Sequence, residues 1–160
     1  MAKHVATIAW KDDGGFPTGR YSRAHEMRFD GGAVVRGSSS PHVVPLPFSD
    51  PAGVDPEEAL IASASACHML WFLNLAQDAG LHVTRYEDEA EGTMERVGRG
   101  RQAITRIVLR PRIAFSGREP GADELQALHH EAHERCFIAN SMKSEIVVES
   151  PAELEFTPAT

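Results

Sequence analysis

The chain has 160 residues, 42% hydrophobic and 24% charged, which is ordinary for one soluble globular domain. Its formal net charge of −7 argues against non-specific binding to nucleic acid or to anionic membranes. A chain of this size buries about 70% of its unfolded surface, so its stability requires neither a disulfide scaffold nor a structural metal. We therefore expect a single domain over residues 1–160.

The N-terminal third reads as a β-meander followed by a long loop. Alternating apolar and polar residues predict strands at residues 4–11, 20–29 and 33–37, separated by turns rich in aspartate and glycine. Residues 38–53 contain four prolines, which cannot donate hydrogen bonds to a ladder, so they predict a loop. Loops of this length are usually functional or mobile.

Residues 55–58, Asp-Pro-Glu-Glu, are the strongest helix start in the chain. The aspartate can cap the helix, proline suits its first turn, and the glutamates favour the positive end of its dipole. The helix should run to about residue 79, with Gly80 following its end. Polar side chains interrupt its apolar sequence, so we expect a buried core or interface helix and no membrane span.

The second half should contain two long strands, at residues 83–96 and 103–115, joined by a turn. Acidic residues on the first and arginines on the second read as solvated strand faces paired across a hairpin. A second helix is expected at residues 122–135, followed by strands at 143–149 and 154–156. This order predicts an α+β fold with largely antiparallel sheet.

Two cysteines are the main candidates for chemistry. Cys67 lies in the middle of the first helix among small residues, and Cys136 follows the second helix, where a neighbouring loop would leave its thiol mobile or accessible. Taken alone, each is more often an inert buried thiol. As a pair they fit peroxide chemistry, in which one thiolate attacks the O–O bond and becomes a sulfenic acid, and the second thiol condenses with it to a disulfide.

Such a thiolate needs a cation beside it. The helix N-terminus is too distant to serve, because Cys67 lies ten residues after Glu57, about 15 Å along the helix axis. An arginine from a strand or loop is therefore needed. His68 points about 100° away from Cys67 around the helix, so we do not expect it to act as a direct base.

A metal site is the competing interpretation. His129 and His133 have the i, i+4 spacing that can chelate zinc, and Cys67 and Cys136 could complete the ligand set. The absence of a Cys-x-x-Cys pair and of an accompanying acidic ligand weighs against it. The alternative is that this histidine face of the helix is partly solvated. The sequence also lacks a G-x-S-x-G nucleophile motif, a P-loop and a dinucleotide fingerprint.

Two motifs frame the cysteines. The first runs from Asp-Pro-Glu-Glu at residues 55–58 to Ser-Ala-Cys-His at residues 65–68, and the second is Cys-Phe-Ile-Ala-Asn at residues 136–140. Together, in this order and with this interval from glutamate to cysteine, they resemble the motifs of the OsmC/Ohr family (osmotically inducible protein C and organic hydroperoxide resistance protein). The resemblance covers nearly the whole chain.

The resemblance implies a cofactor-free, thiol-dependent peroxidase in oxidative stress defence. It would prefer organic hydroperoxides to hydrogen peroxide and would be reduced by a dithiol such as a lipoylated protein. The implied fold is an intertwined homodimer with antiparallel sheets around long central helices and active sites at the subunit interface. Carried over by position, Cys67 is peroxidatic, Cys136 is resolving, and Glu57 holds an arginine toward the thiolate. If Glu57 and Cys67 serve one site, the partner subunit supplies one of them.

The arginine is where the sequence departs from the family pattern. Family members carry it in the first β-hairpin or just before the Pro-Glu-Glu motif, and residues 45–54 contain none. The first hairpin offers Arg20 and Arg23, of which we favour Arg20, next to a glycine. His68 also stands where an aromatic residue is often found. We therefore interpret the chain as a divergent member.

The alternative function is a non-catalytic small-ligand or metal-binding domain with the same fold. Residues 45–48 and 71–72 are apolar and could shape a ligand pocket, although core packing explains them equally well. The chain begins without a basic segment followed by an apolar run, so we expect no signal peptide and a cytoplasmic location.

Overall fold

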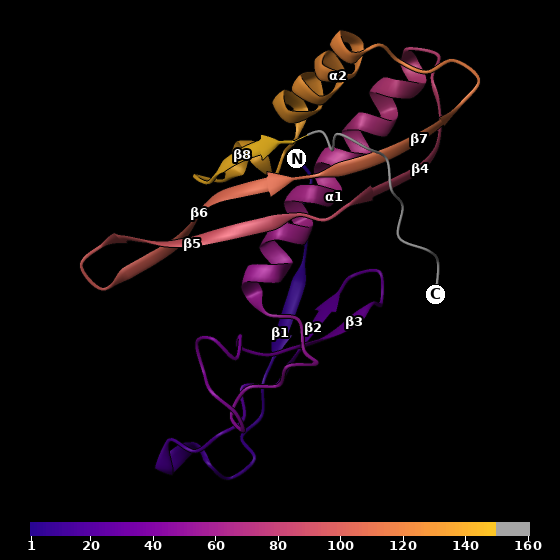
Figure 1. The fold of residues 1–160 in the computed structure, drawn as a ribbon. Coiled ribbons are helices and arrows are strands. Elements are labelled where there is room, and N and C mark those ends of the chain that lie inside the picture. The colour runs from indigo at the N-terminus through magenta and orange to yellow at the C-terminus, as the bar shows by residue number, and fades with distance from the viewer. Residues whose placement is uncertain (150–160) are drawn as a thin grey trace. The chain divides into compact units, whose positions relative to one another are not determined.

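A computed structural model describes residues 1–149, which form an α+β fold of eight strands, two α-helices and two short 3-10 helices (Figure 1). The predicted fold class is confirmed. The chain divides into two compact units, Met1–Ala59 and Leu60–Thr160. The strand predicted at residues 154–156 lies outside the described residues.

The first unit contains a three-stranded antiparallel sheet in the order β1 (Ala6–Ala9), β2 (His25–Phe29) and β3 (Val34–Gly37). The predicted meander is confirmed, but its second strand begins five residues later than expected. Before it, the Asp12 carboxylate accepts hydrogen bonds from two backbone N–H groups, at 3.0 and 3.1 Å, and a 3-10 helix η1 (Phe16–Thr18) follows. These local bonds turn the backbone away from an extended ladder.

Helix α1 (Pro56–Asp78) starts and ends as predicted. The Glu58 N–H donates to Asp55 Oδ1 at 2.7 Å and the Asp55 N–H donates to Glu58 Oε2 at 3.0 Å, which is a capping box. Gly80 takes a left-handed φ of +72° just after the helix, and its N–H donates to the carbonyl of Gln77. The buried residues recur every fourth position: Ala64, His68, Phe72 and Ala76.

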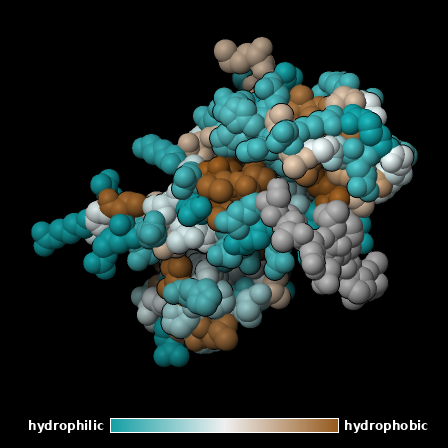
Figure 2. All heavy atoms as spheres, turned by 45° about the horizontal axis from the view of Figure 1, so that its top comes forward, coloured by the Kyte–Doolittle hydropathy of each residue, from teal (hydrophilic) through white to brown (hydrophobic). Residues whose placement is uncertain are grey.

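α1 is long and apolar enough to cross a membrane by length and composition, a property it shares with core helices of globular proteins. Only 22% of its most apolar 18-residue window is buried within the described part of the chain. Figure 2 shows exposed apolar side chains gathered in patches among hydrophilic ones. On the second unit the large exposed apolar side chains include Leu60, Leu70, Met94, Val97 and Phe137. α1 is therefore not a fully buried helix within the described residues.

The second unit holds two sheets and the second helix. Its elements are β4 (His82–Asp88), β5 (Glu91–Gly98), β6 (Arg101–Leu109), β7 (Pro111–Ser116), α2 (Ala122–Arg135), η2 (Ala139–Ser141) and β8 (Glu145–Val148). β4 pairs with β7 in an antiparallel two-stranded sheet. β5, β6 and β8 form the other sheet, in which β8 runs parallel to β6. The helix at 122–135 and the strand within 143–149 are as predicted.

The two long strands predicted at 83–96 and 103–115 are each broken in two, so that part of the prediction is wrong. The Asp88 carboxylate accepts a hydrogen bond from the backbone N–H of Arg110 at 2.6 Å, which replaces a ladder partner at the junction. Pro111, the next residue, has no N–H to donate. The pairing of acidic and arginine side chains across the strands is confirmed at one pair: Arg112 Nη2 lies 3.0 Å from Glu87 Oε1 across β4 and β7, where both side chains are only partly exposed.

The core of the second unit consists of two clusters that share α1. One joins α1 to α2 and to β7, and its buried members are Phe72, Ala76, Leu81, Ile113 and Ala132. The other joins α1 to β6, and its buried members are Ala64, Ile107 and Leu109. Figure 1 shows α2 beside the C-terminal half of α1. This packing positions both cysteines.

Candidate functional site

Cys67 is half-buried and borders an open pocket of about 500 Å³. One face of α1 and the chain just after α2 form its lining, which comprises Ser63, Ala66, Cys67, Leu70, Trp71, Asn74, Phe137 and Ile138. The rings of Trp71 and Phe137 meet edge to face with centroids 5.6 Å apart. Most of the lining is apolar, so the pocket suits an apolar molecule placed directly at the Cys67 sulfur.

The structure places the two apolar residues 71 and 72, both candidates for a pocket wall, in different surroundings. Trp71 lines the pocket, whereas Phe72 is fully buried in the core on another face of α1. Sequence reasoning missed Phe137 as a pocket wall, although it directly follows the second cysteine. The signal in the sequence was an aromatic residue directly after a candidate reactive cysteine.

Cys136 is the residue that ends α2, and it is only 1% exposed. Its N–H donates to the carbonyl of His133 at 3.1 Å, and its sulfur accepts a hydrogen bond from the Ala139 N–H at 3.3 Å. The chain after the helix therefore folds back over the thiol as η2. The expectation of a mobile or accessible thiol is wrong, because these backbone contacts and the neighbouring core enclose it.

The structure brings the two predicted cysteines together as free thiols. Burial, and next a hydrogen bond with the Cys67 side chain, raise the pKa of Cys136 to about 11, while backbone N–H groups of Ala139 and Ile138 oppose the shift. Cys136 therefore stays protonated at neutral pH, and its S–H can donate to the Cys67 sulfur. Cys67 faces the pocket and Cys136 stands behind it.

Glu57 and Arg20 both lie in the first unit. Within residues 1–149 the Glu57 carboxylate forms no ion pair with an arginine. Arg20 instead lies over the Phe48 ring at 5.9 Å. Arg23 lies over the Tyr21 ring at 3.7 Å and donates to the Tyr21 carbonyl at 2.5 Å. The roles assigned to Glu57 and Arg20 remain predictions.

The histidines form an unexpected buried pair. His68 Nε2 on α1 lies 3.0 Å from His129 Nδ1 on α2, and the ring planes are within 11° of parallel. His129 is only 5% exposed, so the prediction of a solvated histidine face is wrong at this residue. Within the described part of the chain, no group of three or more His, Cys, Asp or Glu side chains could hold a metal ion. His68 contacts His129 on α2, and the expectation that it does not serve Cys67 as a base stays a prediction.

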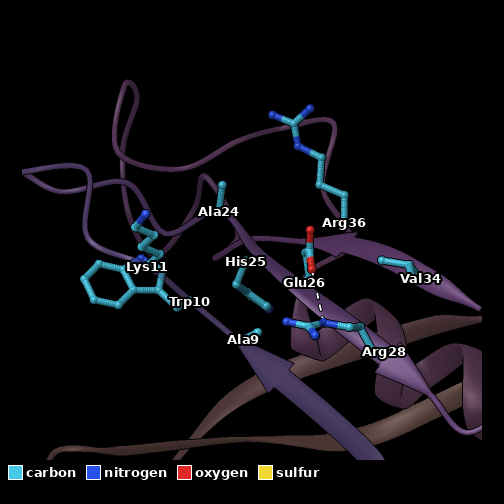
Figure 3. Close-up of a pocket in the computed structure, with 9 residues that line it drawn as sticks. All are labelled: Ala9, Trp10, Lys11, Ala24, His25, Glu26, Arg28, Val34 and Arg36. Carbon is cyan, nitrogen blue, oxygen red and sulfur yellow. Dashed lines mark ion pairs between the residues drawn. The ribbon is translucent and has the colours of Figure 1, made fainter.

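A separate pocket of about 690 Å³ lies in the first unit (Figure 3). It is lined by Ala9, Trp10, Lys11, Ala24, His25, Glu26, Arg28, Val34 and Arg36. Two of its three cations are neutralised, since Arg28 pairs with Glu26 at 3.2 Å and Arg36 pairs with Asp50. The pocket contains no thiol and lacks the charge concentration of an anion site.

Comparison with known proteins gives one consistent result. Residues 49–150 match the family model of the OsmC-like protein. An OsmC-like protein of unknown function from Vibrio cholerae O1 biovar eltor str. N16961 is 45% identical, with a TM-score of 0.91, covering 94% of this chain and 100% of that one. No curated protein matches the sequence.

Two more distant solved structures share the fold. An organic hydroperoxide resistance protein from Elizabethkingia anophelis is 18% identical, with a TM-score of 0.67 and 94% of each chain covered. The organic hydroperoxide resistance protein OhrB of Bacillus subtilis is 16% identical, with a TM-score of 0.67, covering 94% of this chain and 98% of that one. With the family match over most of its length, the chain belongs to the OsmC-like protein family.

Proposed function

We propose that this protein is a thiol-dependent peroxidase that reduces organic hydroperoxides in oxidative stress defence. The observation that carries the proposal is the placement of Cys67 at an open apolar pocket with the protonated Cys136 thiol behind it. The relatives named as organic hydroperoxide resistance proteins support this class. The relative at 45% identity has no known function, so the support from similarity stops at the family.

The proposed reaction has three steps. The Cys67 thiolate attacks one peroxide oxygen, the O–O bond breaks, and the alcohol leaves after taking a proton, which leaves a sulfenic acid. Cys136 then loses its proton and attacks the Cys67 sulfur, forming the disulfide and releasing water. A dithiol reductant such as a lipoylated protein returns both thiols and becomes a disulfide itself. No cofactor takes part.

The apolar lining supports a preference for organic hydroperoxides over hydrogen peroxide. Leu70, Trp71 and Phe137 offer an organic group a surface that excludes water, and they offer the small polar H₂O₂ little. Binding energy from the organic group then helps to hold the O–O bond near the Cys67 sulfur.

A homodimer belongs to this proposal. The long apolar α1 is little covered within the protomer, and a second copy would bury its exposed side chains, such as Leu70. Glu57 lies about 15 Å from Cys67 along the helix, so a site using both takes one from each subunit. Glu57 would then orient Arg20 toward the thiolate of a neighbouring Cys67. We expect this assembly in the cytoplasm.

The experiment tests a panel of peroxides in two ways: turnover with a dithiol as reductant, and the number of free thiols after one equivalent of peroxide. One equivalent of cumene hydroperoxide should lower the number of free thiols from two per chain to none, and H₂O₂ should do so more slowly. Cys67→Ser should consume no peroxide, whereas Cys136→Ser should complete one turnover and hold a sulfenic acid. Thiols that survive every peroxide would exclude the peroxidase and leave a small-ligand-binding domain, for which the same pocket provides space.

A further inference from the structure

The buried pair of His68 and His129 links the two helices that carry the cysteines. His68 directly follows Cys67 on α1, and His129 lies seven residues before Cys136 on α2. Their ring nitrogens are 3.0 Å apart, and the Phe72 ring stacks on His129 with centroids 4.5 Å apart. Between the side chains of Pro56–Asp78 (α1) and Ala122–Arg135 (α2), all of them described, this is the only hydrogen bond.

The hydrogen-bond partners of the two rings determine which nitrogen of each carries the proton. His68 Nδ1 is buried and has no partner within the described residues. A buried N–H without an acceptor is costly, so the proton of His68 belongs on Nε2 and is donated to His129 Nδ1. The proton of His129 then sits on its Nε2. His129 also lines a pocket together with His130 and His133. The bridge holds one proton, so His129 Nδ1 must be unprotonated to accept it. A second proton on His68 Nδ1 would be buried without an acceptor, which keeps His68 neutral as well.

The surroundings keep the rings neutral. Burial lowers the pKa of both histidines to about 4, with His133 contributing to the shift of His68 and His68 to that of His129. The other titratable groups on this side of α1 come from β4: Tyr86, whose ring packs 5.7 Å from that of Phe72, and Asp88, which accepts a hydrogen bond from Ser65. The Asp88 carboxylate is also bonded to the Arg110 N–H and does not contact the pair.

The position of Cys136 depends on α2, because Cys136 ends that helix through its bond to the His133 carbonyl. A disulfide needs its sulfur atoms to close from non-bonded contact to about 2 Å in a defined geometry. A small shift of α2 along α1 would separate the sulfurs. Apolar contacts alone, such as Ala132 against Phe72, have little directionality to prevent sliding.

We propose that His68 and His129 are positioning residues that hold α2 in register on α1 and so keep Cys136 within reach of Cys67. Neither histidine touches the substrate. The inference rests on the proposed roles of the cysteine pair, and it concerns the second step, disulfide formation, rather than the attack on peroxide. It assigns a use to the histidine that stands next to Cys67 where an aromatic residue is often found.

The test measures disulfide closure without peroxide. 4,4′-Dithiodipyridine reacts with Cys67 to form a mixed disulfide and releases one thiopyridone. Cys136 then attacks the Cys67 sulfur, the protein disulfide forms, and the released pyridine thiolate takes up a proton equivalent to the one that Cys136 lost and leaves as a second thiopyridone. The two absorbance phases report Cys67 reactivity and Cys136 positioning separately.

His129→Leu should slow the second phase about tenfold or more while changing the first less than about twofold, because a directional bond is lost and a buried donor is left unpaired. His129→Gln offers a carbonyl that can accept the same bond and should recover most of the rate. The same comparison can be made at the donor: His68→Leu should slow the second phase, and His68→Gln should recover most of the rate, since the glutamine amide can donate to His129. The control is His130→Leu, an exposed neighbour on α2 that should match the wild type.

Equal rates of the second phase in the leucine and glutamine variants at both positions would overturn the proposal, because packing alone would then explain the rates. If the His129 variants fail to fold, the His68 pair decides the question. If hydroperoxides are not consumed but the leucine variants still slow the second phase, the peroxidase is wrong and the positioning role stands. If peroxide is consumed and disulfide closure is unchanged in the leucine variants, the positioning role alone is wrong.

Discussion

The Cys67 side chain lies close enough to the buried Cys136 thiol to help raise its pKa, yet only Cys67 borders the open pocket. In the proposed reaction, this asymmetry would set the order of the two thiols: a peroxide that enters the pocket would meet Cys67 first, and burial would withhold Cys136 until Cys67 is oxidised.

Alkylation should distinguish the two thiols in the folded protein. With a pKa near 11, only about 0.1% of Cys136 is thiolate at pH 8, and burial blocks the reagent as well. Iodoacetamide should therefore modify Cys67 more than about 100-fold faster than Cys136. The Cys136 rate should rise about tenfold per pH unit toward pH 11 while the fold persists. Peptide mapping by mass spectrometry measures both, and similar rates in folded protein would contradict the enclosed thiol. In urea the difference should disappear.

Phe72 and Phe137 provide a matched pair of aromatic truncations. Phe72 is fully buried between α1 and its neighbours, so Phe72→Ala should cost about 3–5 kcal/mol in the free energy of unfolding. Phe137 is 69% exposed, so Phe137→Ala should cost less than about 1 kcal/mol. It should instead raise KM for bulky hydroperoxides, because it removes one pocket wall. Urea titration of both variants is the check, and a large destabilisation by Phe137→Ala would assign that ring to the core.

The capping box at the start of α1 should contribute measurably to stability. Asp55→Ala removes the acceptor for the Glu58 N–H and should lower the free energy of unfolding by about 1 kcal/mol. Asp55→Asn should retain most of it, because the amide oxygen can accept the same bond. Glu134→Ala, at an exposed position of α2, is the control for loss of a carboxylate. Equal effects at positions 55 and 134 would mean that charge, not capping, matters.

The histidine pair should make stability fall with acidification. Both rings have a pKa of about 4 in the folded protein and an ordinary value of 6.5, so between these values the unfolded chain binds more protons. Stability is therefore full above pH 6.5 and is lost as the pH falls toward 4, by up to about 1.4 kcal/mol per pH unit per histidine.

Urea unfolding at pH 7, 5.5 and 4.5 measures this slope. The double variant His68→Leu/His129→Leu should have a smaller slope than the wild type, and His130→Leu should keep it. Carboxylates titrate in all three proteins, so the difference between proteins isolates the buried rings. Identical slopes in the wild type and the double variant would show that the pair is not held neutral by burial.

Much of the secondary structure, and the places of both cysteines in it, could be predicted from the sequence, because the signals for these features are local. The capping residues at 55–58, Gly80 after the helix and the apolar repeat along α1 act within one or two helical turns. The two motifs around Cys67 and Cys136 also identified the family that the comparisons confirm. For these features, chain neighbours decide the conformation.

Tertiary contacts decided the rest. The long strands break where Asp88 meets the Arg110 backbone, 22 residues away, and Cys136 is enclosed by a chain that turns back over it. His68 and His129 are 61 residues apart, and helical spacing states which side of a helix each occupies but not what lies opposite. A buried hydrogen bond between elements that are distant in the sequence depends on how those elements pack, so local sequence patterns do not predict it.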